Sequence, residues 1–264
     1  MVSALFFLRS SLRHHLPKVF VTLLLSFIFA HSALAIVNVE TLRARAGSSQ
    51  GWSSAGSLNA SGTSGNSDKS NVSISGLLQL LRPNYSNLIV IGSEYGEASG
   101  NKNADKQVLH LRHTRNLSVR TAWEAFTQWQ QNEFTRLEER SLLGSGFRFR
   151  FGNGETRTLN LGVGGFYESE RNENEATKEI GRSNLYASFK STLSSGASFV
   201  STVYLQNKLD ELSDKRSIGN FSFSVPFAEH LEFVLNVSVE HDSRPPVGIE
   251  KTDWSYKTGI GWKF

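Results

Sequence analysis

The sequence predicts an all-β protein, a transmembrane antiparallel up-and-down β-barrel of about 12 strands. The stretch Trp254–Phe264 places aromatic and aliphatic side chains at every second residue, with small or cationic ones between them. Successive side chains of a strand point to opposite faces, so this stretch has one apolar and one polar face. Similar alternation recurs along the chain, and the connections between these stretches alternate in length. A barrel with lipid outside and a polar lumen accounts for all three observations.

The N-terminal residues 1–35 read as a secretory signal. An apolar run at 19–30 is preceded by three basic residues, Arg9, Arg13 and Lys18. The run is shorter than the roughly 20 residues that a membrane-spanning helix needs. It is followed by the small-x-small pattern of Ala33 and Ala35, which predicts the signal cleavage site.

Charge and cysteine content narrow the class of protein. The formal charge is 28 − 24 = +4, but the signal holds three of the basic residues and no acid, which leaves 25 − 24 = +1. This balance gives no reason to expect a nucleic-acid partner. The absence of cysteine excludes a disulfide scaffold and a thioether-linked lipid anchor.

After the signal, residues 36–51 form a polar lead-in without steady alternation, and the barrel is expected from 52 to 264 as a single domain. The predicted strands are 52–61, 69–81, 85–95, 106–115, 119–132, 140–151, 156–168, 182–193, 197–207, 215–225, 231–241 and 253–264. The first of them is the weakest, because it is mostly Ser, Gly and Ala.

The predicted connections form two groups. Short ones are expected at 82–84, 116–118, 152–155, 194–196 and 226–230. Longer ones are expected at 62–68, 96–105, 133–139, 169–181, 208–214 and 242–252. Short turns at one end and longer loops at the other are typical of outer-membrane barrels.

The last strand ends in Trp262 and Phe264. An aromatic residue at the end of an amphipathic last strand resembles the C-terminal assembly signature of Gram-negative outer-membrane barrels. The signature implies outer-membrane lipid and the barrel assembly machinery as partners.

The polar phase of the strands is expected to face the lumen. The lumen-facing candidates are Glu124, Gln128, Arg140, Arg148, Arg150, Glu168, Lys190, Glu232 and Lys257. Antiparallel pairing places Glu124 near Arg148 and Arg140 near Glu168, to within about two residues. Such charges either form structural ion pairs or line a constriction that selects solutes by charge. A barrel of about twelve strands lies between filled and open sizes, so both interpretations stay open.

No residue pattern predicts catalysis, a cofactor or a metal site. The stretch Gly47–Gly51 matches Gly-x-Ser-x-Gly but lacks the strand before it and the helix after it. His110 and His113 are three residues apart, which places them on opposite faces of a strand. The acidic residues of the 169–181 loop could gather divalent ions, although a solvated loop explains them more simply.

Short motifs in a fixed order resemble the YdiY-like family of "salt-induced outer membrane proteins", a domain of unknown function. They are Ser64-Gly65-Asn66, Trp123–Gln128, Phe134 with Arg136, Arg140 with Gly144–Arg148, Gly162-Val163-Gly164 with Tyr167-Glu168, Arg182 with Tyr186, Tyr204-Leu205-Gln206, Asp214–Arg216, and His241–Pro246 with Asp253. The chain has Asn207 where this family often has proline. The resemblance implies an exported outer-membrane barrel and no established activity.

The sequence favours a non-enzymatic outer-membrane protein without a cofactor, exported by a cleaved signal and acting as a narrow pore or an envelope protein of salt or acid stress. One alternative is a barrel enzyme of the lipase or protease type at the outer leaflet. Another is a soluble exported β-sandwich that binds a ligand.

Overall fold

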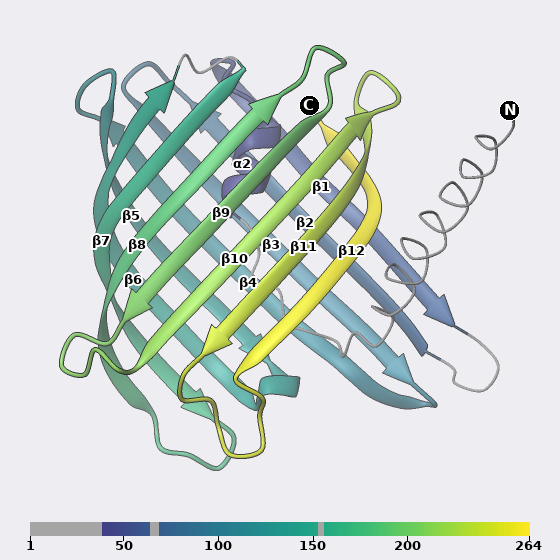
Figure 1. Ribbon diagram of the computed structural model, residues 1–264, viewed down its shortest axis with the longest axis vertical. Coiled ribbons are helices and arrows are strands. Elements are labelled where there is room, and N and C mark those ends of the chain that lie inside the picture. Colours follow the sequence, from purple (N-terminus) through teal and green to yellow (C-terminus); the bar gives the residue numbers. More distant parts are fainter. Residues whose placement is uncertain (1–38, 64–68, 153–155) are drawn as a thin grey trace, which may run out of the picture. The chain divides into compact units, whose positions relative to one another are not determined.

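The computed structural model describes residues 39–63, 69–152 and 156–264. The predicted signal, with Ala33 and Ala35, lies outside the described residues. Twelve antiparallel strands close into a barrel in which each strand pairs with its neighbours in sequence and β1 pairs with β12 (Figure 1). This closure confirms the predicted barrel and rules out the β-sandwich, whose two sheets do not close on each other.

The strands are β1 Gly51–Thr63, β2 Lys69–Leu81, β3 Tyr85–Ala98, β4 Asn101–Asn116, β5 Thr121–Asn132, β6 Leu137–Gly152, β7 Arg157–Asn172, β8 Lys178–Thr192, β9 Ser198–Asn207, β10 Lys215–Pro226, β11 Leu231–Asp242 and β12 Thr252–Lys263. A helix α2, Val39–Ala46, precedes them, and a 3-10 turn η1, Glu133–Thr135, follows β5. Among the described residues, no helix has the length and apolar composition needed to span a bilayer.

The outer face of the barrel is apolar. Phe233 on β11 and Trp254 on β12 are more than half exposed, whereas Glu232, which precedes Phe233 in the opposite phase, is buried. The same alternation separates exposed Leu235 from half-buried Asn236 on β11. An outward band of aliphatic and aromatic side chains is what a barrel presents to lipid.

Several strands extend beyond the predicted bounds, and the predicted loop at 96–105 is wrong. β3 and β4 run to a two-residue turn in which Ser99 and Gly100 have φ of 51° and 77°. Two positive φ values define the tight hairpin turn that matches strand twist. Loops 133–139 and 169–181 likewise shrink to 133–136 and 173–177. These strands continue through polar residues. Beyond the apolar band of the barrel, backbone pairing alone extends a strand and its side chains need not be apolar. Of the described connections, 208–214 and 243–251 are the long ones, both at the same end of the barrel.

The barrel closes where the chain ends. Ser54 and Phe264 exchange two backbone hydrogen bonds of 2.8 and 2.9 Å. Trp262 lies flat over Gly56, where an added Cβ would fall 2.3 Å from the indole ring. The β1–β12 ladder then runs only from Ala55 to Asn59. The terminal aromatics therefore contact the seam at which the sheet joins itself.

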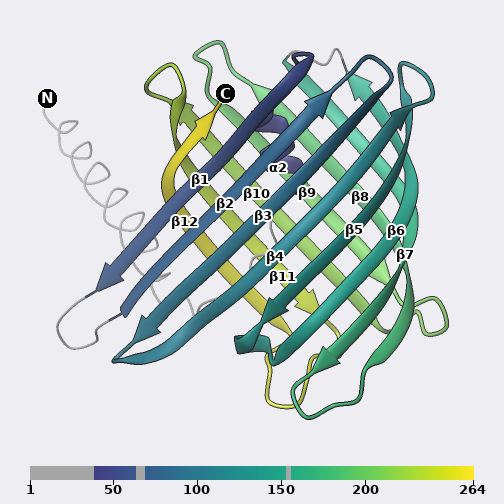
Figure 2. The same ribbon diagram turned by 180° about the vertical axis from the view of Figure 1, so that it is seen from behind.

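Helix α2 lies inside the barrel. Figures 1 and 2 show it between the two opposite walls, near the end of the barrel at which β1 begins. The predicted lead-in 36–51 thus contains an ordered helix at a place where the side chains show no strand alternation. Eight residues are too few for a stable isolated helix, so contacts with the wall must hold α2 in place.

Candidate functional site in the barrel lumen

One side of α2, hereafter the plug helix, is held by apolar contacts. Val39 and Leu42 are almost fully buried and pack against Leu77, Leu88 and Val90, which point inward from β2 and β3. An apolar patch on a lumen wall is unusual, since inward positions of such barrels are mostly polar. Burying each aliphatic side chain contributes about 1.5–3 kcal/mol. This patch therefore fixes where the plug helix rests.

The other side is held by charges, in a group that we call the plug cluster: Glu40, Arg43, Arg112, Glu124 and Arg148. Glu40 accepts two hydrogen bonds of 2.9 Å from Arg148 and one of 3.0 Å from Arg112. Arg43 of the helix in turn donates to Glu124 at 3.0 Å. A helix residue of each sign is thus paired with a wall residue of the opposite sign, which fixes the rotation of the helix.

The carboxylate of Glu40 stays ionised in this setting. Burial by itself would raise its pKa, but the guanidinium groups of Arg148, Arg43 and Arg112 outweigh burial and lower the pKa to about 2. Paired and hydrogen-bonded charges are the form in which buried charges are tolerated.

Aromatic side chains lie beside the plug cluster, and one of them bonds to it. The Tyr186 hydroxyl donates to Glu124 at 2.7 Å and accepts from Arg148 at 3.1 Å. Its ring lies over Gly162, where an added Cβ would be 1.9 Å from the ring. Glycine at that position is required for the tyrosine to reach across the lumen. Phe126, Phe166 and Tyr204 also point inward at this level.

Three further contacts hold the C-terminal end of the plug helix. Arg45 bonds Glu232 of β11 and the Gly56 carbonyl, the latter at 2.8 Å. Lys190 of β8 donates to the Ala44 carbonyl at 2.7 Å. Capping of the last carbonyls by cations is favourable at a helix C-terminus.

A second group lies at the end of the barrel that carries the 208–214 and 243–251 loops. We call it the wall cluster: Arg140, Glu168, Glu170, Arg182, Asp214, Arg216 and Asp242. Glu168, only 1 % exposed, is 2.7 Å from Arg182 and 3.1 Å from Arg216. Arg140 lies 2.5 Å from Glu170 and 3.8 Å from Glu168. Six of its members lie on strands of the barrel wall, and Asp214 is the last residue of the 208–214 loop.

The predicted lumen residues are distributed over these groups. Glu124 and Arg148 are 3.7 Å apart, but Arg148 has its shorter contacts with Glu40. In the β5–β6 and β6–β7 ladders, Glu124 is opposite Gly146 and Arg140 is opposite Glu170, so each pairing lies within the two-residue margin of its prediction.

The remaining candidates lie apart from both clusters. Gln128 bonds His110 at 3.0 Å, and Lys257 bonds Glu94 at 2.5 Å. Arg150 is exposed near the mouth and makes no ion pair with another described residue. The acidic loop 169–181 brings no metal-ligating group together among the described residues.

Sequence reasoning missed Glu40, Arg43 and the inward Leu77, Leu88 and Val90. The helix signal was nevertheless present. An acid in the first turn and two arginines in the last turn suit the helix dipole.

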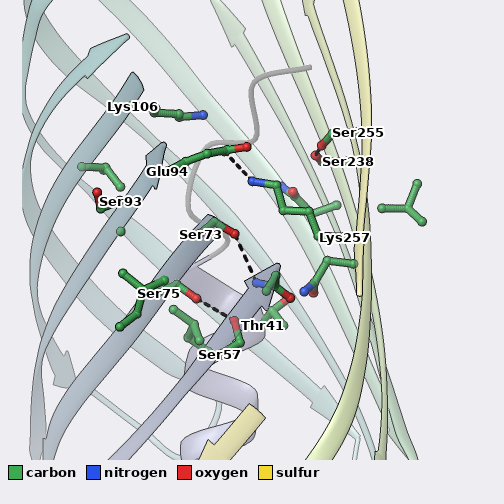
Figure 3. Close-up of a pocket in the computed structure, with 18 of the residues that line it drawn as sticks. Thr41, Ser57, Ser73, Ser75, Ser93, Glu94, Lys106, Ser238, Ser255 and Lys257 are labelled. Atoms are coloured by element: carbon green, nitrogen blue, oxygen red, sulfur yellow. Dashed lines mark hydrogen bonds and ion pairs between the residues drawn. The ribbon is translucent and has the colours of Figure 1, made fainter. Parts of the chain in front are cut away.

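Three small cavities lie in the lumen among the described residues, two of them beside the plug helix. The first, of about 100 Å³, lies between α2 and the β1–β3 and β10–β12 walls, and hydroxyl and amide side chains line much of it (Figure 3). The second, also about 100 Å³, lies under the 243–251 loop. A third of about 60 Å³ lies between Val39 and the wall cluster. Together they leave narrow spaces in the lumen.

A closed barrel with an apolar outside and a largely polar lumen is the fold of porin-like outer-membrane barrels. Residues 57–264 match the family described as "Protein of unknown function, DUF481", and the chain belongs to that family. No curated protein is significantly similar in sequence.

Several solved structures resemble the fold, among them a porin and the translocator domain of an autotransporter. The NanC porin aligns over 80 % of this chain and 100 % of its own, with 8 % identity and a TM-score of 0.52. The translocator domain of the autotransporter NalP from Neisseria meningitidis aligns over 84 % and 93 %, with 12 % identity and a TM-score of 0.51. At such identities the likeness concerns the fold alone.

Proposed function

We propose that this protein is a non-enzymatic outer-membrane barrel whose lumen is closed by the plug helix, and that it passes small solutes only when the helix is displaced. The observation that carries the proposal is the pairing of Glu40 and Arg43 with Arg148 and Glu124 across the lumen. The helix is covalently joined to β1 and makes no backbone–backbone hydrogen bond with a strand among the described residues. It can therefore leave its position without breaking the sheet.

The polar contacts of the histidines support a role without catalysis. In the part of the chain that the structure describes, they bond Gln128, Asn87, Thr252 and the Lys263 carbonyl. None of these contacts joins a histidine to a serine hydroxyl, as a hydrolase triad requires. The proposal includes export by the predicted signal and assembly in the outer membrane. It also includes the finer resemblance to YdiY-like proteins, with a role in salt or acid stress.

Conductance in planar bilayers tests the proposal. The native protein should conduct little, and deletion of residues 39–46 should produce larger, long-lived openings. The chain has no cysteine, so Leu42→Cys with Leu88→Cys can join the helix to the patch it packs on. This variant should be closed when oxidised and should open more often after reduction. Equal conductance of the native and deleted forms would reject the plug.

A further inference from the structure

One buried cation in the lumen has no partner in either cluster. Lys106 on β4 is 6 % exposed, and its ammonium makes no hydrogen bond or ion pair with another described residue. Figure 3 shows its side chain beside Glu94 at the edge of the first cavity. Lys106 also lines the second cavity, so it borders both cavities.

The acids near Lys106 do not neutralise it by contact. Glu94, directly opposite on β3, bonds Lys257 at 2.5 Å and Asn71 at 3.0 Å. Asn132, opposite on β5, directs its side-chain oxygen to the Phe134 N–H. Arg140 lines the second cavity and is paired with Glu170 and Glu168. Glu240 lines the same cavity and has interactions of its own. An ammonium offers three donors, and leaving them buried without oxygen acceptors is costly.

The lining of the first cavity has an excess of positive charge. Its charged residues are Arg45, Lys106, Lys257 and Glu94. Arg45 is paired with Glu232 and Lys257 with Glu94, so the cation left without an ion pair is Lys106. Serine hydroxyls from β1 and β2 surround the same space, including Ser57, Ser73 and Ser75 (Figure 3). Hydroxyl and ammonium donors facing one space are the chemistry that recognises a carboxylate or phosphate group.

We propose that Lys106 is the anchor of a binding site for a small oxyanion, reached from the second cavity and enclosed by the hydroxyl-lined first cavity. The ligand is either inorganic phosphate or the carboxylate of a small organic solute. Ionisable residues at membrane depth commonly mark solute pathways. Binding at this site does not require displacement of the plug helix, so the site can be tested independently of the proposed pore.

Calorimetric titration of the folded barrel in detergent tests the site. Inorganic phosphate, acetate and gluconate are titrated at constant ionic strength into the native protein, Lys106→Gln and Lys106→Arg. The glutamine variant should bind about tenfold more weakly or worse, as expected when one charged hydrogen-bond partner is lost. The arginine variant should retain binding. Tighter binding of gluconate than of phosphate would identify the ligand as an organic carboxylate. Tighter binding of phosphate would identify it as inorganic phosphate.

Lys102→Gln is the matched control, because Lys102 is on the same strand but lies in the exposed mouth, paired with Asp105 and Glu133. It should bind as the native protein does. The ligand should also raise the unfolding temperature of the native protein and of this control, but not of Lys106→Gln. Absence of binding by the native protein, or equal losses in the Lys106 and Lys102 variants, would overturn the site.

Discussion

The plug cluster and the wall cluster consist of the same side chains, carboxylates and guanidiniums, yet they are fixed in different ways. The wall cluster joins strands whose register is set by the sheet, such as Arg140 on β6 and Glu170 on β7. The plug cluster joins the wall to a helix that is outside the sheet. Charge pairs of the first kind persist while the barrel persists, whereas those of the second kind depend on where the helix lies.

The charge balance of the two clusters sharpens the difference. Without the helix, the wall side of the plug cluster keeps Arg112 and Arg148 against Glu124, a net charge of 2 − 1 = +1. Three arginines and four acids remain in the wall cluster whether or not the helix is present. Displacement of the helix therefore changes the electrostatics around its own wall partners and leaves the charge balance of the wall cluster as it is.

The largest expected effect is in the wall cluster. Glu168→Gln leaves Arg182 and Arg216 without the carboxylate that both contact. Removing one partner of a buried pair costs about 3–5 kcal/mol, and lumen water reduces this toward the lower value. Urea unfolding in lipid vesicles should show a clearly lower midpoint.

Its control is Glu173→Gln, because Glu173 lies in an exposed loop, 3.9 Å from Arg136. Exposed pairs contribute little, so its midpoint should remain near the native value. If the two variants were equally stable, the wall cluster would have no structural role.

A smaller effect on stability, with a larger effect on conductance, is expected from Glu40→Gln. The change deprives Arg148 and Arg112 of their shortest ionic contacts. The helix can leave, and water can then reach the two arginines, so the barrel should lose only about 1–2 kcal/mol. Bilayer recordings should show frequent openings. A variant that unfolds like Glu168→Gln but stays closed would remove the distinction between the clusters.

The next smaller effect is expected from Leu42→Ala, which weakens the apolar contact with Leu77 and Leu88. Loss of a buried leucine costs about 2–5 kcal/mol in a closed core, but here the loss cannot exceed the free energy that docks the helix. Openings should increase as they do in Glu40→Gln.

Salt distinguishes the two plug variants. In Leu42→Ala the remaining charge pairs are screened, so openings should become more frequent at high ionic strength. Openings of Glu40→Gln should depend less on salt. The opposite order in matched recordings would show that the apolar patch, rather than the charges, orients the helix.

The strands could be predicted from sequence because alternation records the lipid and lumen faces directly. On β11 the polar Glu232 is buried and its neighbour Phe233 is exposed, and Asn236 and Leu235 differ in the same direction. The short β3–β4 turn could not be predicted from alternation, because polar residues such as Lys102 and Asp105 continue a strand above the membrane.

The plug helix was harder to predict for a different reason. Its apolar partners are Leu77, Leu88 and Val90 of β2 and β3, which look like lipid-facing residues until the helix that covers them is known. The charge partners were individually visible: Glu124 and Arg148 were expected in the lumen. Their pairing with Glu40 depends on a segment of only eight residues that carries little periodicity.

The smallest effect on conductance is expected from a change of pH within the neutral range. The pKa of Glu40 is lowered from 4.5 to about 2 when the helix is docked. Because docking lowers this pKa, the ionised Glu40 carboxylate stabilises the docked helix at pH values above the undocked pKa, near 4.5. This stabilisation is lost as the pH falls toward 2. Conductance of the native barrel should therefore be constant between pH 7 and about 5 and should rise only in stronger acid. Glu40→Gln, which cannot ionise at this position, should show a weaker rise over the same interval. Opening between pH 7 and 6 in the native protein would assign control of the helix to a group other than Glu40, and mild acid would then be a signal that this plug detects.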